Sequence, residues 1–210
     1  MGGGQLPKDV LCIEQSLGKL PEPMKRPPFV VLIGLPGTGK SYFCRRLTKG
    51  VDLAILESDA LRKVLFKVPS HTSEENSRLF EACYCLIEEL LNNGIPVALD
   101  STNLEEHYRE RLYAIADRTK AKLVLVRVEA SPEVVRDRLM KRAVAVDRED
   151  SSDADWIIYQ RMRGAVDKVG RNHFVVDTSR DISPVNERIV RKINGKTTKT
   201  MLLPVFCRGV

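Results

Sequence analysis

The stretch Gly34-Leu-Pro-Gly-Thr-Gly-Lys-Ser41 decides the fold of this chain, because its spacing fits G-x-x-x-x-G-K-[ST], the pattern of a phosphate-binding loop. The apolar run 29–33 before it suits a buried parallel strand, and residues 41–48 after it predict a helix. Glycines let the backbone turn its N–H groups toward phosphate oxygens, and the helix start adds partial positive charge. A chance glycine-rich turn would not need this order of strand, loop and helix, so we expect a bound nucleoside triphosphate.

Side chains within this loop have separate expected roles. The Lys40 ammonium would reach the β- and γ-phosphates, and the Ser41 hydroxyl would ligate Mg²⁺. The predicted cofactors are therefore ATP and Mg²⁺. The residues expected to bind ATP are Gly34, Pro36, Gly37, Thr38, Gly39, Lys40, Ser41 and Tyr42.

The composition favours one α/β domain, since the chain has 210 residues of which 43% are hydrophobic. No apolar run approaches the roughly 18 residues that span a bilayer, and the N-terminus lacks the apolar segment of a secretory signal. We expect a cytoplasmic protein with no membrane partner; the oligomeric state is not predicted. The net charge of +6 suits a protein that handles phosphates, but it fits a nucleic acid and a small anion equally.

A zinc site is not expected. The five cysteines are odd in number and, like the three histidines, are dispersed along the chain. Cys83 and Cys85 lie two apart on an expected helix, so they point in different directions. Reduced, mostly buried thiols are the favoured interpretation.

Apolar runs that suit strands alternate with patterns that suit helices. The expected strands are 29–33, 52–56, 96–100, 122–128 and 174–177. The expected helices are 5–20, 41–48, 60–66, 73–92, 103–118, 131–143, 154–169 and a last one from 183. This order predicts an α/β fold with a doubly wound, parallel, five-stranded sheet, a nucleoside-kinase-like P-loop NTPase with a helical lid.

We divide the chain into three parts. Residues 1–27 hold an amphipathic helix and a proline-rich connector, 28–194 form the P-loop domain with a lid at about 133–155, and 195–210 are a C-terminal tail. The first helix could bind a partner or a membrane surface, but packing back on its own domain is favoured. The tail could be an edge strand, an interaction segment or disorder.

Polar residues follow the carboxyl ends of the expected strands, which right-handed crossovers gather at one edge of the sheet. Asp59 follows the second strand and opens a helix, with Arg62 one turn later on the same face. A carboxylate that takes a hydroxyl proton, beside a guanidinium that holds an anionic group, suits the acceptor site of a kinase. A helix cap and a surface charge are the alternative, which the phosphate-binding loop makes weaker.

Three further positions fit the same edge. Asp100 ends an apolar strand, the usual form of an acid that holds Mg²⁺; it could instead orient the acceptor or merely form a turn. Arg138 and Arg142 lie four apart on a helix and would close over the triphosphate, although a solvated charged helix is the alternative. Asp177-Thr-Ser179 follows the fifth strand and could border the adenine.

Four segments resemble the kinase domain of polynucleotide 5′-hydroxyl kinases and the broader small P-loop kinases of the AAA_33 and zeta-toxin type. They are Gly34–Ser41, Glu57-Ser-Asp-Ala-Leu-Arg62, Asp100-Ser-Thr-Asn103 and the Arg138/Arg142 pair. The resemblance covers roughly residues 28–177. The chain has neither the D-x-D-x-[TV] motif of a phosphatase after an apolar strand nor an appended nucleic-acid domain, so the acceptor stays open.

The resemblance implies specific roles. Asp59 would be the general base and Arg62 would hold an acceptor phosphate, while Asp100 and Asn103 would line the acceptor site. Arg142, with the arginine one turn before it, would act from the lid. The residues predicted to be catalytic are therefore Asp59, Lys40, Arg142 and Arg138. Those predicted to hold the metal are Ser41 and Asp100.

These observations predict an ATP-dependent kinase that phosphorylates a hydroxyl of a small molecule or of a nucleic-acid 5′ end. The alternatives are a P-loop ATPase acting as a switch or motor, and a non-catalytic ATP-binding regulatory protein. The chain contains neither the Asn-Lys-x-Asp motif of GTPases nor the Leu-Ser-Gly-Gly-Gln signature of transport ATPases. Its aromatic residues form no base-stacking series near the site, so a nucleic acid is not required.

Overall fold

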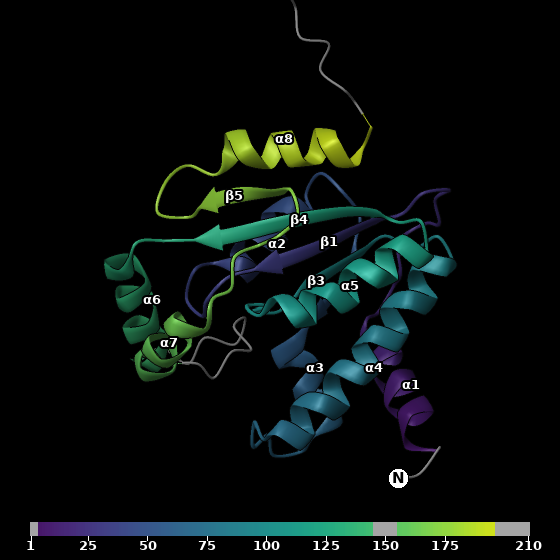
Figure 1. Cartoon of the computed structure of the whole chain (residues 1–210), viewed down its shortest axis with the longest axis horizontal. Coiled ribbons are helices and arrows are strands. Elements are labelled where there is room, and N and C mark those ends of the chain that lie inside the picture. Colours follow the sequence, from purple (N-terminus) through teal and green to yellow (C-terminus); the bar gives the residue numbers. More distant parts are fainter. Residues whose placement is uncertain (1–3, 145–154, 196–210) are drawn as a thin grey trace, which may run out of the picture.

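A parallel sheet is the centre of the computed structural model of the protein, which describes residues 4–144 and 155–195 (Figure 1). Its five strands are β1 (Pro28–Ile33), β2 (Ala54–Glu57), β3 (Val97–Asp100), β4 (Lys122–Glu129) and β5 (His173–Asp177). Their spatial order is β2-β3-β1-β4-β5, and every pair is parallel. β1 lies in the middle, so the loop after it opens at the switch point of the sheet, where such folds bind ligands.

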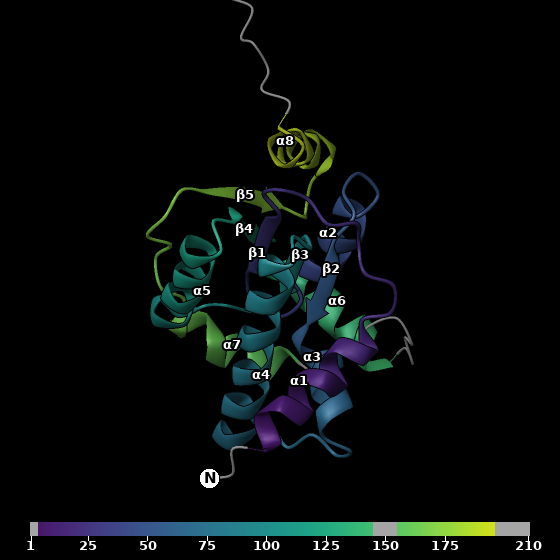
Figure 2. The same ribbon diagram turned by 90° about the vertical axis from the view of Figure 1, so that its right-hand side faces the viewer.

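Helices cover both faces of the sheet (Figures 1 and 2). On one face lie α2 (Lys40–Leu47) and α8 (Ser183–Ile193). On the other face lie α1 (Gln5–Ser16), α3 (Ser58–Leu65), α4 (Ser73–Asn92) and α5 (Glu106–Arg118). The predicted fold class, a doubly wound five-stranded α/β sheet, is confirmed.

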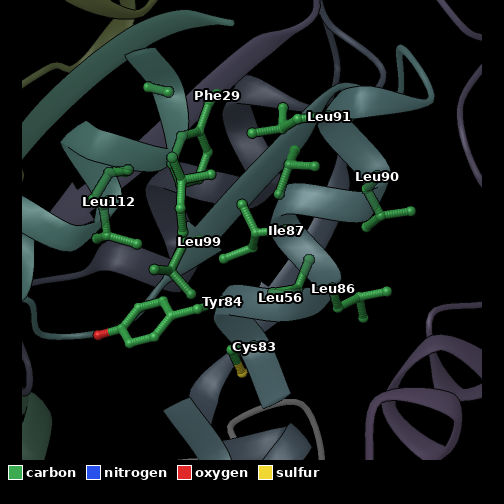
Figure 3. Close-up of a cluster of buried hydrophobic side chains, with 14 of the residues drawn as sticks. Phe29, Leu56, Cys83, Tyr84, Leu86, Ile87, Leu90, Leu91, Leu99 and Leu112 are labelled. Atoms are coloured by element: carbon green, nitrogen blue, oxygen red, sulfur yellow. The ribbon is translucent and has the colours of Figure 1, made fainter. Parts of the chain in front are cut away.

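The residues of β1 explain why there are two helical layers. Phe29, Val31 and Ile33 belong to the core beneath α3, α4 and α5, whereas Val30 and Leu32 belong to the core beneath α2 and α8. Successive strand residues point to opposite faces, so an uninterrupted apolar run needs a cover on both. Figure 3 shows the larger core, in which Phe29 gathers with buried side chains of β3, α4 and α5.

A smaller helical group lies beyond the carboxyl ends of the strands (Figure 1). It contains α6 (Pro132–Val144), α7 (Trp156–Met162) and the short 3₁₀ turn η1 (Arg163–Ala165). Helix α6 belongs to the predicted lid, whereas α7 and η1 follow its predicted end at about residue 155. Residues 145–154 of that lid and 196–210 of the predicted tail lie outside the described residues, so the predicted division of the chain stays a prediction.

Three predicted helices are wrong in extent, and the first of them, expected over 5–20, ends at Ser16. The helix expected over 154–169 is only α7 followed by η1, because Gly164 weakens it and the Asp167 N–H binds the Leu104 carbonyl instead of an intrahelical one. The helix expected from Asn103 begins at Glu106. Asn103 does not cap it: this residue has a φ of +46° and is buried.

The N-terminal helix α1 packs against α3 and α4 rather than standing apart (Figure 2). Val10 and Ile13 are buried in the larger core. The side chain of Asp9 is only 4% exposed and receives two hydrogen bonds from Arg78 of α4, from Nε at 2.6 Å and from Nη2 at 2.7 Å. The Arg78 guanidinium lowers the pKa of Asp9, against the effect of burial. Among the described residues, no helix is both long and apolar enough to cross a membrane.

We expect Arg78→Met to lower the free energy of unfolding by about 2 kcal/mol, since it leaves the buried Asp9 carboxylate without its cation. Because the pKa of Asp9 is lowered in the folded state, this loss is full above pH 3.8 and shrinks as the pH falls further. Chemical denaturation at several pH values measures it. Arg118→Met, which breaks an exposed pair with Glu88, is the control and should cost under about 1 kcal/mol. Equal losses in both variants would contradict the role of the Asp9 pair.

Candidate active site

The loop between β1 and α2 depends on two glycines, one where a neighbouring strand comes too close for a side chain and one with a positive φ. A Cβ at Gly34 would collide with the Val128 carbonyl oxygen, so β4 can approach the loop only at a glycine. Gly39 has a φ of +91° and directly precedes α2, whose first N–H groups therefore face the loop. The remaining predicted ATP-binding residues of the loop lie here as expected, whereas Tyr42 is half exposed in the first turn of α2.

The charged end of Lys40 lies over this loop. Its Nζ donates a hydrogen bond to the Leu35 carbonyl at 3.2 Å. Thr38 stabilises the same turn, because its hydroxyl donates to the Leu35 carbonyl at 2.8 Å. The ammonium is thus held against the loop that the motif predicts to bind phosphate.

The Asp100 carboxylate is influenced electrostatically by several of the other predicted site residues. Asp100 ends β3 and is 4% exposed. Burial raises the pKa of its carboxyl, and the charge of Asp59 raises it further, whereas the Lys40 charge and a hydrogen bond with Ser41 lower it. The start of α2 and the start of α3, which are distant in sequence, therefore both influence the carboxylate at the end of β3.

The pair of Ser41 and Asp100 fits a magnesium ion. Mg²⁺ prefers oxygen ligands and binds through one or two protein groups together with waters and phosphate oxygens. The described part of the chain has no group of three or more acidic, histidine or cysteine side chains that could hold a metal by themselves. A metal at this hydroxyl and carboxylate would therefore complete its coordination with waters and with oxygens of a bound nucleotide.

Arg62 is not the surface charge that the alternative interpretation offered, since it is only 5% exposed. Its Nη2 donates to Asn76 Oδ1 at 2.6 Å, and Nη1 lies 3.5 Å from Glu75 Oε2. Nε and Nη1 find no hydrogen-bond partner among the described residues. Buried donors without partners are rare and unfavourable, so these two N–H groups are suited to an incoming anion.

Asn103 has a structural contact that the sequence did not indicate. Its Nδ2 donates to the Leu32 carbonyl at 2.7 Å, and the neighbouring Thr102 carbonyl accepts from the Gly34 N–H at 3.0 Å. These bonds hold the loop after β3 against the end of β1. The amide nitrogen is thus committed to the scaffold, and a contact of Asn103 with the acceptor stays a prediction.

Arg138, the first of the two predicted lid arginines, bonds to the segment after β5 and to the phosphate loop. Arg138 donates from Nη1 to Thr178 Oγ1 at 2.8 Å and from Nη2 to the Thr178 carbonyl at 2.9 Å, and its Nη1 lies 3.4 Å from the Gly37 carbonyl oxygen. Its guanidinium thus contacts the phosphate loop through the Gly37 carbonyl, and its action on the triphosphate stays a prediction. Arg142 lies half-buried one turn later, and its action on the nucleotide stays a prediction.

The lid helices rest directly on the phosphate loop. Val135 and Leu139 of α6 form an apolar cluster with Tyr159 of α7, and Leu35 of the loop packs against it. A Cβ at Gly37 would come within 2.9 Å of Val135, so this contact also depends on a glycine. A movement of α6 would therefore change its packing contacts with the loop.

Arg109 joins the loop after β3 to the segment that follows η1. The sequence pattern of its helix does not indicate that it is buried. It is fully buried, and its guanidinium donates to the carbonyls of Asn103 and Leu104 in the loop after β3. It also donates to the carbonyls of Asp167 and Lys168, at 3.2 and 3.1 Å, in the segment that returns from the lid. The only sequence signal was a glutamate three residues earlier, which is a common helical spacing.

A family model for AAA domains, AAA_33, matches residues 29–169. The chain belongs to the AAA_33 family. The matched range runs from β1 through the lid and contains all the predicted site residues.

Known proteins of similar sequence or fold include kinases. A shikimate kinase of Corynebacterium glutamicum is 36% identical over 90 residues, which are 40% of this chain and 53% of that protein. The chain thus spans about half the length of this curated relative. The structure of Chaetomium thermophilum Kti12 with ADP-AlF3 has a TM-score of 0.64 at 22% identity and covers 80% of this chain and 98% of that one. An APS kinase of Mycobacterium tuberculosis, bound to AMPPNP and APS, has a TM-score of 0.59 at 16% identity, covering 82% and 99%.

The fold is therefore that of a P-loop kinase, and the predicted site residues stay a prediction. The structural likenesses establish the fold alone, since the identities are low.

We expect Asp100→Asn to raise the free energy of unfolding at pH 7, because the folded state disfavours the Asp100 charge. The pKa is raised on folding, so wild-type stability falls as the pH rises from 3.8 through the raised value, and the advantage of the variant vanishes below 3.8. Thermal melting across pH measures this. Asp117→Asn is the control with opposite sign, because Arg171 lowers the pKa of the exposed Asp117. A destabilised Asp100→Asn at pH 7 would contradict the prediction.

Proposed function

We propose that the protein is an ATP- and Mg²⁺-dependent kinase that transfers the γ-phosphate of ATP to a hydroxyl of an acceptor that also carries an anionic group. The acceptor is a small molecule or a nucleic-acid 5′ end. The observation that supports this proposal is that Lys40, Ser41 and Asp59 all act electrostatically on the buried Asp100 carboxylate. A second carboxylate, that of Asp59, is thus within electrostatic range of the same buried acid as the residues that follow the phosphate-binding loop.

The donor half of the proposed site is the loop after β1. Its N–H groups and the Lys40 ammonium would bind the phosphates, and Ser41 with Asp100 would hold the metal. When bound, Mg²⁺ would neutralise charge on the phosphate oxygens. Arg142 of the lid is proposed to add positive charge from the opposite side.

The acceptor half lies at the start of α3. The acceptor oxygen would attack the γ-phosphorus, the bond between that phosphorus and ADP would break, and the hydroxyl proton would pass to Asp59. The Nε and Nη1 of the buried Arg62, which have no hydrogen-bond partner among the described residues, would bind the anionic group of the acceptor, one helical turn from the base. In this proposal Asp59 accepts the proton, and Arg62 selects acceptors that carry an anionic group.

The comparisons support this proposal without naming the acceptor. The family match covers the whole proposed site, and the curated relative is a kinase for a small molecule by its name. Only about half of that relative is matched, so its substrate is not assigned to this chain. The cytoplasmic location likewise stays a prediction.

We expect Asp59→Asn to reduce phosphoryl transfer by about 10² to 10⁴-fold, the usual contribution of a general base, while ATP binding changes little. Transfer of label from γ-labelled ATP and equilibrium binding of ATP measure the two effects. Asp52→Asn is the matched control, because Asp52 is exposed just before β2, at the opposite end of that strand. Unchanged turnover of Asp59→Asn would exclude Asp59 as the base.

The acceptor is tested with labelled ATP and a panel of 5′-hydroxyl oligonucleotides, nucleosides, sugars and their phosphorylated forms. We expect labelling only of acceptors that bear an anionic group. In Arg62→Met the KM for such an acceptor should rise at least about 10-fold, because a charge-assisted hydrogen bond is lost. Rapid ATP hydrolysis without any acceptor would favour the switch or motor alternative, and labelling of neutral acceptors alone would contradict the role of Arg62.

A further inference from the structure

Thr178 is a buried residue that the proposed chemistry does not use, yet it touches the phosphate loop. It follows β5 and is 7% exposed. Its hydroxyl donates a short hydrogen bond to the Thr38 carbonyl, with 2.6 Å between the oxygens, and accepts the 2.8 Å bond from Arg138 Nη1. Its own N–H donates to the Glu129 carbonyl at 2.9 Å, which fixes it to the end of β4.

Arg138 completes this contact from the side of the lid. Besides its two bonds to Thr178, its Nη1 lies 3.4 Å from the Gly37 carbonyl oxygen. Two consecutive carbonyls of the phosphate loop, those of Gly37 and Thr38, are therefore drawn toward one threonine hydroxyl and one guanidinium. A Cβ at Gly39 would lie 3.1 Å from Thr178 Oγ1, so the loop is in close contact with both partners.

The orientation of these carbonyls determines where the loop directs its donors. In a trans peptide the C=O and N–H groups point in opposite directions, and all peptides of the described residues are trans. A Thr38 carbonyl that is held toward Thr178 therefore turns the Gly39 N–H the other way, away from Thr178. Phosphate oxygens are bound by N–H groups that face a common concavity, so fixing this peptide fixes the direction of one such donor.

We propose that Thr178 is a positioning residue which, together with Arg138, fixes the phosphate loop in the conformation that binds the triphosphate. This inference rests on the proposed function and adds a residue outside the loop motif. It also links the lid to the donor site, because Arg138 belongs to α6. The ligand affected is the polyphosphate part of the nucleotide, not its base.

Thr178→Val tests this proposal, since it removes the hydroxyl while keeping the shape of the side chain. Thr178→Ser is the matched control, which keeps the hydroxyl. The probes are ATP and inorganic tripolyphosphate, whose dissociation constants are measured by calorimetry. We expect Thr178→Val to weaken both about 10-fold and Thr178→Ser to stay within about 2-fold of wild type. Melting temperatures show that the variants are folded, and Arg138→Met, with a similar loss for both probes, is the second variant if Thr178→Val does not fold.

The outcomes separate this proposal from the proposed function. Wild-type affinity of Thr178→Val for both probes overturns the positioning role and leaves the kinase proposal intact. Loss of ATP binding with normal tripolyphosphate binding also overturns it, because Thr178 would then act on the adenine. If the loss for both probes is found, but wild type transfers no phosphate to any acceptor, the positioning role holds and the kinase proposal fails.

Discussion

A carboxylate buried at the carboxyl end of β3 is the constraint on which the site depends. Burial opposes the charge of Asp100, and the Lys40 ammonium and the Ser41 hydroxyl offset that cost. Both groups come from the turn after β1, which reaches Asp100 because β1 and β3 are neighbours in the sheet. The order of the strands, rather than nearness in sequence, thus assembles the donor site.

The same order places the acceptor residues. β2 pairs with β3 so that Glu57 stands opposite Asp100, and α3 begins at the next residue, which brings Asp59 within the electrostatic range of Asp100. Arg62 follows one turn later and is covered by α4, which α1 supports in turn through Asp9. The N-terminal helix lies outside the range matched by the family, yet it stabilises the wall that carries the proposed anion contact.

Local sequence patterns were sufficient to predict much of this structure, because apolar strand runs and the glycine spacing of the loop depend on only a few neighbouring residues. The five strands and the phosphate loop were predictable for that reason. The contacts of Asn103, Arg109 and Arg138 were not predictable, since each side chain bonds to backbone carbonyls that are distant in sequence. Every residue has the same backbone carbonyl, so no residue type marks such a partner in the sequence. A helical arginine is usually solvated, so the burial of Arg109 follows only from the tertiary fold.

The contacts of Arg109 and Ser179 mark where the segment that holds α6 and α7 leaves the sheet domain and where it returns to it. This segment begins where the Ser131 N–H donates to Ser179 Oγ at 2.9 Å, and it ends where Arg109 binds the carbonyls of Asp167 and Lys168. Both attachment points belong to the sheet domain, so the described helices between them, α6 and α7, are tied to the sheet at each end. A chimaera that replaces these helices would have to keep the two anchor points, the apolar face that meets Leu35, and the bonds that Arg138 makes to Thr178.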